Sequence, residues 1–190
     1  MTKVELASYS FKNAETGEDK NFGDYSVGPV LVSTLVQRCS RTKKNAEELE
    51  RLAQKYGDKG LTVIGVFSDH RKVEDSKGAE YYRKKMKVTF PLYGHTTMYE
   101  ESNRHPFFVE LATAQPPPRA NKNRISQFTK FLINKEGKVV ARYNDVVDDA
   151  HIEAVLEGKD IPEAPKKKRA PPKKKAAPKK KAAPKKKAAP

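Results

Sequence analysis

The only cysteine of the 190-residue chain, Cys39, lies in the stretch QRCSRTKK among four basic side chains. These side chains are Arg38, Arg41, Lys43 and Lys44. Nearby positive charge favours a thiolate over a thiol, and cysteines in such settings can have pKa values of about 3.5–7.5. Because the thiolate is the nucleophilic form, this position is suited to redox or nucleophilic chemistry. The alternative is a cysteine that serves only as a small buried hydrophobic side chain.

Three segments around Cys39 predict where it stands in the fold. The β-branched run VLVSTLV (30–36) predicts a buried strand, and LTVIGVF (61–67) predicts a second one. Between them, residues 45–57 have apolar side chains at helical spacing. The three segments predict a βαβ unit with parallel strands. Cys39 then lies at the carboxyl edge of the sheet, which is where open α/β sheets bind ligands.

The predicted helix carries signals for its start and its end. Asn45 and Glu48 have the spacing of a capping pair, and Gly57 is placed to end the helix. The first turn of a helix also presents unpaired backbone N–H groups and the positive end of the helix dipole. Both features would stabilise a negative charge on Cys39.

The remaining pattern completes an α/β domain. We expect a helix at 79–86, a short edge strand at 88–93, a helix at 105–114, a hairpin of 126–133 and 139–144, and a helix at 148–156. This order predicts a thioredoxin-like fold with a central mixed β-sheet flanked by helices. The four histidines have no spacing that suggests a metal site.

The formal net charge of +15 is concentrated at the C-terminus. Residues 165–190 contain twelve lysines, one arginine and no acidic residue, which leaves about +2 for the rest of the chain. The repeat PKKKAA has no large apolar side chain, and its prolines block helix formation. We therefore predict two regions, a globular domain at 1–160 and a disordered basic tail at 161–190.

The tail resembles the Lys-, Ala- and Pro-rich ends of linker histones, and such a chain should bind nucleic acid or another polyanion through phosphate contacts. PKKKR (165–169) is similar to a nuclear localisation signal. A solubilising tail or attachment to an acidic membrane surface are the alternatives. The predicted polyanion-binding residues are Lys166, Lys167, Lys168, Arg169, Lys173, Lys174, Lys175, Lys179, Lys180, Lys181, Lys185, Lys186 and Lys187.

Five segments, read in order, resemble the glutathione peroxidase family, which has a thioredoxin-like fold. The resemblance runs from about residue 5 to residue 156, and it is most specific in the hairpin FTKFLINKEGKVVARY. The other segments are VLVSTLVQRCSRT, GLTVIGVFSDH, KVTFPLY and NRHPFFVEL. It implies that Cys39 is the catalytic cysteine, whose thiolate attacks a hydroperoxide and becomes a sulfenic acid that thiols then reduce.

The resemblance breaks at the residues that surround the nucleophile. Where the family has a glutamine after the second core strand, this sequence has His70. Where the family has a tryptophan and an asparagine, it has Ser126 and Gln127, and Ser40 replaces a glycine after the cysteine. His70 and Gln127 still offer N–H donors, so both are the predicted catalytic helpers of Cys39. Loss of a preorganised donor can cost about 10²–10³ in rate, so weakened activity is expected.

The sequence therefore predicts two alternative functions. The first is a thiol peroxidase that reduces hydroperoxides without a cofactor, using an external thiol such as glutathione or a thioredoxin-like protein because the chain has no second cysteine. The second is an impaired peroxidase-fold binding module held on a polyanion by the tail. One cysteine, no secretory signal and no apolar run of about 18 residues predict a reducing intracellular compartment, the cytoplasm or the nucleus.

Overall fold

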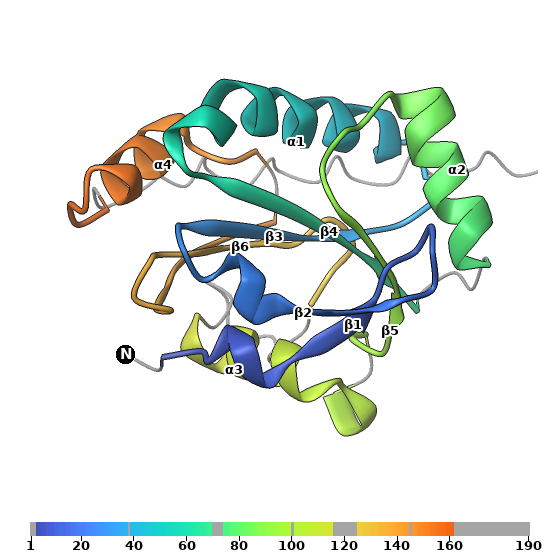
Figure 1. Ribbon diagram of the computed structural model, residues 1–190, viewed down its shortest axis with the longest axis horizontal. Helices are drawn as coiled ribbons and strands as arrows, with labels where there is room; N and C mark the ends of the chain where they lie inside the picture. The colour runs from blue at the N-terminus through green and yellow to red at the C-terminus, as the bar shows by residue number, and fades with distance from the viewer. Residues whose placement is uncertain are drawn as a thin grey trace, which may run out of the picture.

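The computed structural model describes residues 3–37, 39–69, 74–99, 101–115, 125–144 and 146–161. Its helices and strands follow the predicted order, preceded by a short hairpin that the sequence pattern did not suggest (Figure 1). The strands are β1 (Ser10–Lys12), β2 (Asp19–Asn21), β3 (Val30–Leu35), β4 (Thr62–Ser68), β5 (Leu92–Thr96), β6 (Lys130–Ile133) and β7 (Val139–Tyr143). The α-helices are α1 (Thr42–Tyr56), α2 (Asp75–Met86), α3 (Pro106–Ala114) and α4 (Asp149–Leu156).

The central sheet has five strands in the order β5-β4-β3-β6-β7. Strands β3, β4 and β5 run parallel, whereas β6 is antiparallel to both β3 and β7. The predicted mixed sheet and its parallel βαβ unit are thus confirmed. Because β3, β4 and β5 are parallel, their carboxyl ends share one edge of the sheet, and the loop that carries Cys39 starts there.

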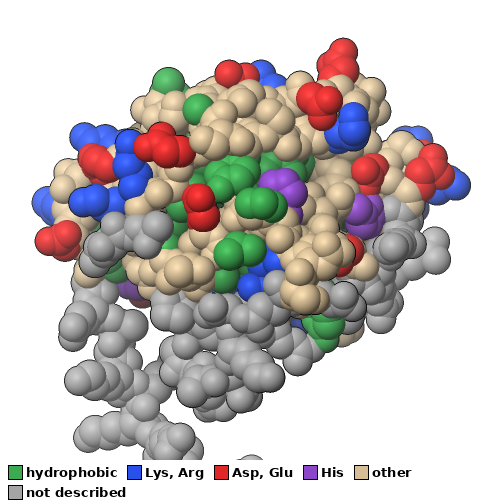
Figure 2. All heavy atoms as spheres, turned by 90° about the horizontal axis from the view of Figure 1, so that it is seen from below, with side chains coloured by type: hydrophobic (Ala, Val, Ile, Leu, Met, Phe, Trp, Pro, Cys, Tyr) green, Lys and Arg blue, Asp and Glu red, His purple; other side chains and the backbone are tan. Residues whose placement is uncertain are grey.

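Helices cover both faces of the sheet, as expected for a three-layer α/β domain (Figure 1). One core packs α1, α2 and α4 against the sheet through residues such as Leu49, Tyr82 and Ile152, which are fully buried. The other core contains Phe107 and Phe108 of α3 together with Phe11 of β1 and Phe22, which follows β2. Seen from the α3 side, hydrophobic side chains are visible near the centre of this face, and most of the visible charged side chains lie toward its margins (Figure 2).

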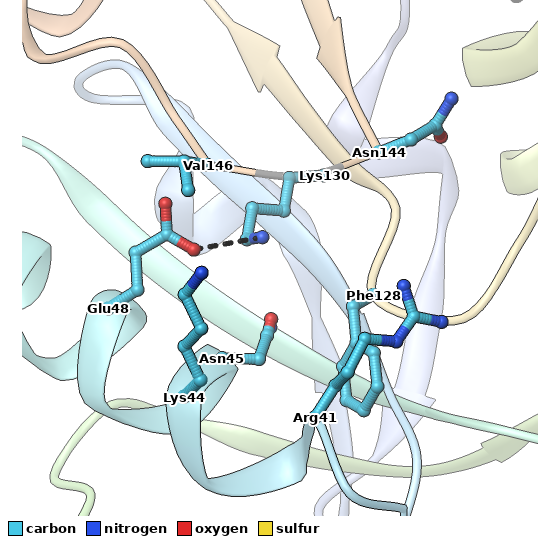
Figure 3. Close-up of a pocket in the computed structure, with 8 residues that line it drawn as sticks. All are labelled: Arg41, Lys44, Asn45, Glu48, Phe128, Lys130, Asn144 and Val146. Carbon is cyan, nitrogen blue, oxygen red and sulfur yellow. Dashed lines mark ion pairs between the residues drawn. The ribbon is translucent and has the colours of Figure 1, made fainter. Parts of the chain in front are cut away.

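The start of α1 differs from the sequence prediction. The helix begins at Thr42, three residues earlier than expected, and its N-cap Arg41 makes no side-chain capping bond. Asn45 and Glu48 therefore lie within the helix, and the predicted capping pair is wrong. Both side chains instead point away from the helix axis toward the β6–β7 hairpin, as Figure 3 shows. The predicted end of the helix is confirmed, since Gly57 is the C-cap.

A buried ion pair joins α1 to the hairpin. Glu48 Oε2 lies 3.1 Å from Lys130 Nζ, and the side chain of Lys130 is only 2% exposed. The second carboxylate oxygen of Glu48 accepts a 2.6 Å hydrogen bond from the backbone N–H of Val147, which follows β7. One carboxylate thus fixes α1, β6 and the segment before α4 relative to one another. Among the ranges given above, no helix is both long and apolar enough to span a membrane.

We predict that Glu48→Gln lowers the free energy of unfolding by about 3–5 kcal/mol, because it leaves the Lys130 charge buried without its carboxylate. The double variant Glu48→Gln/Lys130→Met should recover most of this loss, since no buried charge remains and Gln can still accept from Val147. Urea unfolding measures both values.

The matched control is Glu47→Gln on the adjacent exposed position. Glu47 pairs with Lys43 at 3.7 Å on the surface, so its replacement should change stability by less than about 0.5 kcal/mol. Equal losses for the two single variants would contradict the assignment of the buried pair.

Candidate active site around Cys39

Cys39 lies in the short connection between β3 and α1 and is partly buried. Thr42 fixes this connection, because its hydroxyl accepts from the backbone N–H of Cys39 at 3.1 Å and donates to the carbonyl of Val36 at 2.9 Å. The backbone N–H of Thr42 also donates to the carbonyl of Cys39 at 3.0 Å. The sulfur is therefore held at the carboxyl edge of the sheet, as the strand-to-helix position predicts.

The surroundings of Cys39 lower the pKa of its thiol below the usual value. The main cause is a hydrogen bond from the backbone N–H of Arg41, with further contributions from the Arg41 guanidinium and the Ser40 hydroxyl. Partial burial acts in the opposite direction and does not outweigh them. This environment favours the thiolate more than that of an ordinary cysteine does, and Cys39 is only partly buried rather than part of the core.

Of the three predicted cations that the structure describes, Arg41 is the one that lowers the thiol pKa of Cys39. Arg41 contacts the sulfur, whereas Lys43 pairs with Glu47 on the surface of α1. Arg38 lies outside the described residues. Among the described residues, the backbone and side chain of Arg41 and the Ser40 hydroxyl are therefore the influences that lower the thiol pKa of Cys39.

Gln127 meets Cys39 although the two residues are 88 positions apart in the chain. The thiol Sγ–H donates to Gln127 Oε1 at 3.7 Å. The loop that carries Gln127 is anchored to β3, because the hydroxyl of Thr34 donates to the carbonyl of Ser126 at 3.2 Å. A half-turn of the Gln127 amide would present its N–H₂ group to a thiolate, so the same residue can serve both charge states.

The other predicted site residues are placed differently. Ser126 turns its hydroxyl to Thr129 at 3.1 Å, where the resemblance implies an indole. His70 and all thirteen predicted tail residues lie outside the described residues. The preceding residue, Asp69, accepts hydrogen bonds from the backbone N–H groups of Met98 and Tyr99 and anchors the end of β4 at the same edge of the sheet.

Sequence reasoning missed two residues that shape the Cys39 loop. Thr42, already described, was overlooked because a hydroxyl three residues after the cysteine carries no signal without the loop geometry. Tyr82 of α2 is fully buried and donates its hydroxyl to the carbonyl of Val36 at 3.0 Å. Burial raises the pKa of Tyr82, so this hydroxyl stays protonated as a donor.

A cavity of about 150 Å³ adjoins the site, between the first turns of α1 and the β6–β7 hairpin (Figure 3). It shares Arg41 with the Cys39 site, and Phe128 follows Gln127 directly. Arg41 lies over the ring of Phe128 at 5.5 Å from the ring centre. The residues that line the cavity are Arg41, Lys44, Asn45, Glu48, Phe128, Lys130, Asn144 and Val146.

Comparisons with known proteins agree with this fold. The sequence model of the glutathione peroxidase family matches residues 7–112. A glutathione peroxidase homologue BsaA from Halalkalibacterium halodurans is 30% identical over 131 residues, covering 67% of this chain and 82% of the relative. The hydroperoxy fatty acid reductase gpx1 of Synechocystis is 29% identical over 159 residues, covering 78% and 93%. The crystal structure of T. cruzi GPX1 has a similar fold, with a TM-score of 0.62 and 23% identity over 81% of this chain and 97% of that one.

We predict that Arg41→Gln raises the thiol pKa of Cys39, because the guanidinium contacts are lost while the backbone N–H of residue 41 remains. The thiolate is the form above the pKa, so the variant should react more slowly at neutral pH and equally fast at high pH. The measurement is the rate of alkylation by iodoacetamide against pH, which reports one residue because the chain has one cysteine.

Lys43→Gln is the matched control on the same turn. Its cation is not among the main causes of the lowered pKa of Cys39 and pairs with Glu47 instead, so the pH profile of this variant should overlay that of the unmodified protein. Equal displacement of both profiles would show that general surface charge, and not Arg41, governs the sulfur.

Proposed function

Because the chain belongs to the glutathione peroxidase family, we propose that it is a thiol peroxidase that reduces hydroperoxides through Cys39. The observation that carries this proposal is the lowered thiol pKa at the carboxyl edge of the sheet, with Gln127 in contact with the sulfur. Relatives named as peroxiredoxins and hydroperoxide reductases support the same chemistry. The protein is accordingly an oxidoreductase.

The reaction transfers one oxygen from the peroxide to sulfur. The Cys39 thiolate attacks the terminal oxygen of ROOH, an S–O bond forms, and the O–O bond breaks. The leaving alkoxide takes a proton and departs as alcohol or water, so the peroxide is reduced and Cys39 becomes a sulfenic acid. The amide N–H of Gln127 and the backbone N–H of Arg41 are the donors available to the anions on this path.

External thiols complete the cycle, because Cys39 is the only cysteine of the chain. A first thiol attacks the sulfenic sulfur and releases water, which gives a mixed disulfide. A second thiol attacks that disulfide, releases the Cys39 thiolate and leaves as the oxidised reductant. We propose a low-molecular-weight thiol such as glutathione or a thioredoxin-like protein in this role, and no cofactor.

The altered partners of Cys39 set an upper limit on the rate. We propose His70 as a second donor, from its position after β4 in the sequence. Ser126 cannot replace an indole in bulk or as a donor toward Cys39, since its hydroxyl is used by Thr129. The enzyme should therefore be slower than a peroxidase with the full set of donors.

A second function rests on the charge of the tail. We propose that the basic C-terminal stretch binds nucleic acid or another polyanion, because residues 165–190 contain thirteen cations and no acidic residue. PKKKR fits a nuclear signal, so we propose the nucleus or the cytoplasm as the location. If the chemistry at Cys39 is fully lost, polyanion binding on a peroxidase fold becomes the main function.

We predict that stopped-flow mixing with H₂O₂ or a lipid hydroperoxide oxidises Cys39 rapidly, and that Cys39→Ser abolishes the reaction. Gln127→Leu should slow the second-order rate by about 10²-fold, because a donor to developing charge is removed. A dimedone adduct on Cys39 after brief peroxide exposure identifies the sulfenic acid.

Gln54→Leu is the control for amide removal, since Gln54 lies on the exposed side of α1 and pairs with Glu50. It should react like the unmodified protein. Peroxide consumption that is equally slow in the unmodified protein and in Cys39→Ser would refute the peroxidase function.

We predict that removal of residues 165–190 abolishes salt-sensitive DNA binding and leaves the melting temperature nearly unchanged. For the full chain, log K should fall with log salt by about 0.9 for each phosphate neutralised. Fluorescence anisotropy of labelled duplexes at several salt concentrations measures both. Binding that persists in the truncated protein would assign it to the folded domain instead.

A further inference from the structure

His105 caps the first turn of α3 with its imidazole ring. The first residue of the helix, Pro106, has no backbone N–H, so the N–H of Phe107 is the first donor that needs a partner. The Nδ1 atom of His105 accepts this donor at 3.3 Å. Most capping side chains are hydroxyls, carboxamides or carboxylates. An imidazole can accept at Nδ1 only when it is neutral with its proton on Nε2, so this cap exists in one charge state alone.

The ring of His105 packs against aromatic side chains near the N-terminus of the chain. Its centre lies 4.8 Å from that of Phe11 in β1 and 6.1 Å from that of Tyr9, which precedes β1. This hairpin and α3 lie on the same side of the sheet (Figure 1). Burial among these side chains lowers the pKa of His105, because it disfavours the charged ring. The fold therefore favours the neutral imidazole, which is the state that caps the helix.

Two charged residues on the neighbouring elements already have other partners. Glu110 on the second turn of α3 bonds to Tyr9, and burial together with this bond raises the pKa of the Tyr9 hydroxyl to about 12. Lys12, the charged residue of β1, is exposed and pairs with Asp19 at 3.5 Å. A proton on His105 would also lie at the positive end of the α3 dipole, which adds to the cost of charging the ring.

The loop between β5 and α3 is fastened at the end that leads into this cap. The backbone N–H of His105 donates to the carbonyl of Thr97 at 2.8 Å, and Nε of Arg104 donates to the carbonyl of Met98 at 3.0 Å. Arg104 is only 8% exposed, and as the preceding residue it places a like charge near the ring. The side chains of residues 100 and 101 lie outside the described part of the loop.

Asp69 joins the same loop to the carboxyl edge of the sheet. Its carboxylate accepts from the backbone N–H groups of Met98 and Tyr99 at 3.2 and 3.4 Å. Its own N–H donates to the carbonyl of Thr96 at 3.4 Å. Asp69 directly follows β4, and Cys39 follows the neighbouring strand β3 at the same edge. The loop therefore connects the cap of α3 to the edge of the sheet that carries the candidate active site.

We propose that His105 is a pH-sensitive switch that controls the order of this loop and of the first turn of α3. When the ring takes up a proton, Nδ1 becomes a donor that faces the N–H of Phe107, and the cap is lost. The first turn of α3 then loosens together with the loop, and the contacts of Asp69 with the loop weaken. The switch acts on the backbone at the edge of the sheet and not on the charge of Cys39.

The direction of the pH dependence follows from the lowered pKa of His105. An unfolded histidine titrates near pH 6.5, and burial holds the pKa of His105 in the folded protein below its usual value. The neutral cap therefore contributes its full stability above about pH 6.5. This contribution is lost as the pH falls from there through the lower pKa of the folded state. Acid opens the switch, and a return to neutral pH closes it.

NMR spectroscopy of the full chain tests the switch directly. At about pH 8 the ring nitrogen shifts should identify the Nε2–H tautomer of His105, and the amide shift of Phe107 should follow the titration of the ring. Amide exchange rates in the first turn of α3, divided by the intrinsic rate at each pH, should rise about fivefold when the ring is protonated. The amides of Met98 and Tyr99 should respond with the same midpoint. Helix α1 contains no histidine and is the internal control, whose exchange should not change.

Two variants at the same position give a matched comparison. Asparagine caps helices but does not titrate, so His105→Asn should keep the slow exchange of α3 at both ends of the pH range. Alanine has no capping atom, so His105→Ala should exchange about fivefold faster than the unmodified protein already at high pH, with no further change in acid. The melting temperature of His105→Asn should depend less on pH than that of the unmodified protein.

Each contrary result overturns a defined part of the proposal. An Nδ1–H tautomer at high pH shows that the ring does not accept from Phe107 and removes the cap. A response to acid that persists in His105→Asn assigns the response to another group. A response confined to α3, with Met98 and Tyr99 unchanged, refutes the connection to Asp69. No readout involves peroxide or the thiol, so the outcome is independent of the proposed peroxidase function.

Discussion

The buried contact between Glu48 and Lys130 is the constraint on which the arrangement of the site depends. It joins α1 to β6 across the sheet end, and Glu48 also receives the backbone N–H that follows β7. Cys39 precedes α1, and Gln127 precedes β6, so their contact requires these two elements to keep a fixed separation. Glu48 and Lys130 also line the cavity. The buried ion pair thus helps to keep Cys39 and Gln127 in contact.

The charge state of the sulfur is governed mainly by the backbone. The backbone N–H of Arg41 is the largest influence that lowers the thiol pKa, and Thr42 holds the loop in the conformation that directs this N–H toward the sulfur. A hydrogen bond from the backbone is less affected by substitution of neighbouring side chains than hydrogen bonds from several side chains are. This explains how the nucleophile can stay activated although the residues at the positions of Ser126 and His70 differ from the family pattern.

Much of the fold could be predicted from the sequence, because β-branched runs and helical spacing are local signals. Strands β3 and β4, the C-terminal hairpin and helix α4 were all indicated in this way. The N-terminal hairpin of β1 and β2 was missed, since its strands have three residues each and β2 is fully exposed. The start of α1 was predicted wrongly because Asn45 is of a residue type that often caps helices, but here it is buried within the helix.

The sequence could predict a site residue only where its position along the chain is enough to place it in the fold. Cys39 follows from a strand-to-helix junction, whereas its contact with Gln127 depends on how β6 lies beside β3 and came from the family resemblance. Neither pattern nor resemblance indicated the cavity, because its lining comes from α1, the hairpin and the segment after β7. Long-range packing creates such a space, and short sequence motifs do not encode it.

The presence of a single cysteine affects how long Cys39 stays oxidised. The sulfenic acid formed at Cys39 has no second cysteine in the chain with which to close a disulfide. Its reduction to the thiol therefore depends on the supply of thiols in the surroundings. When that supply runs low, the oxidised form should accumulate, so that its abundance records recent exposure to oxidant.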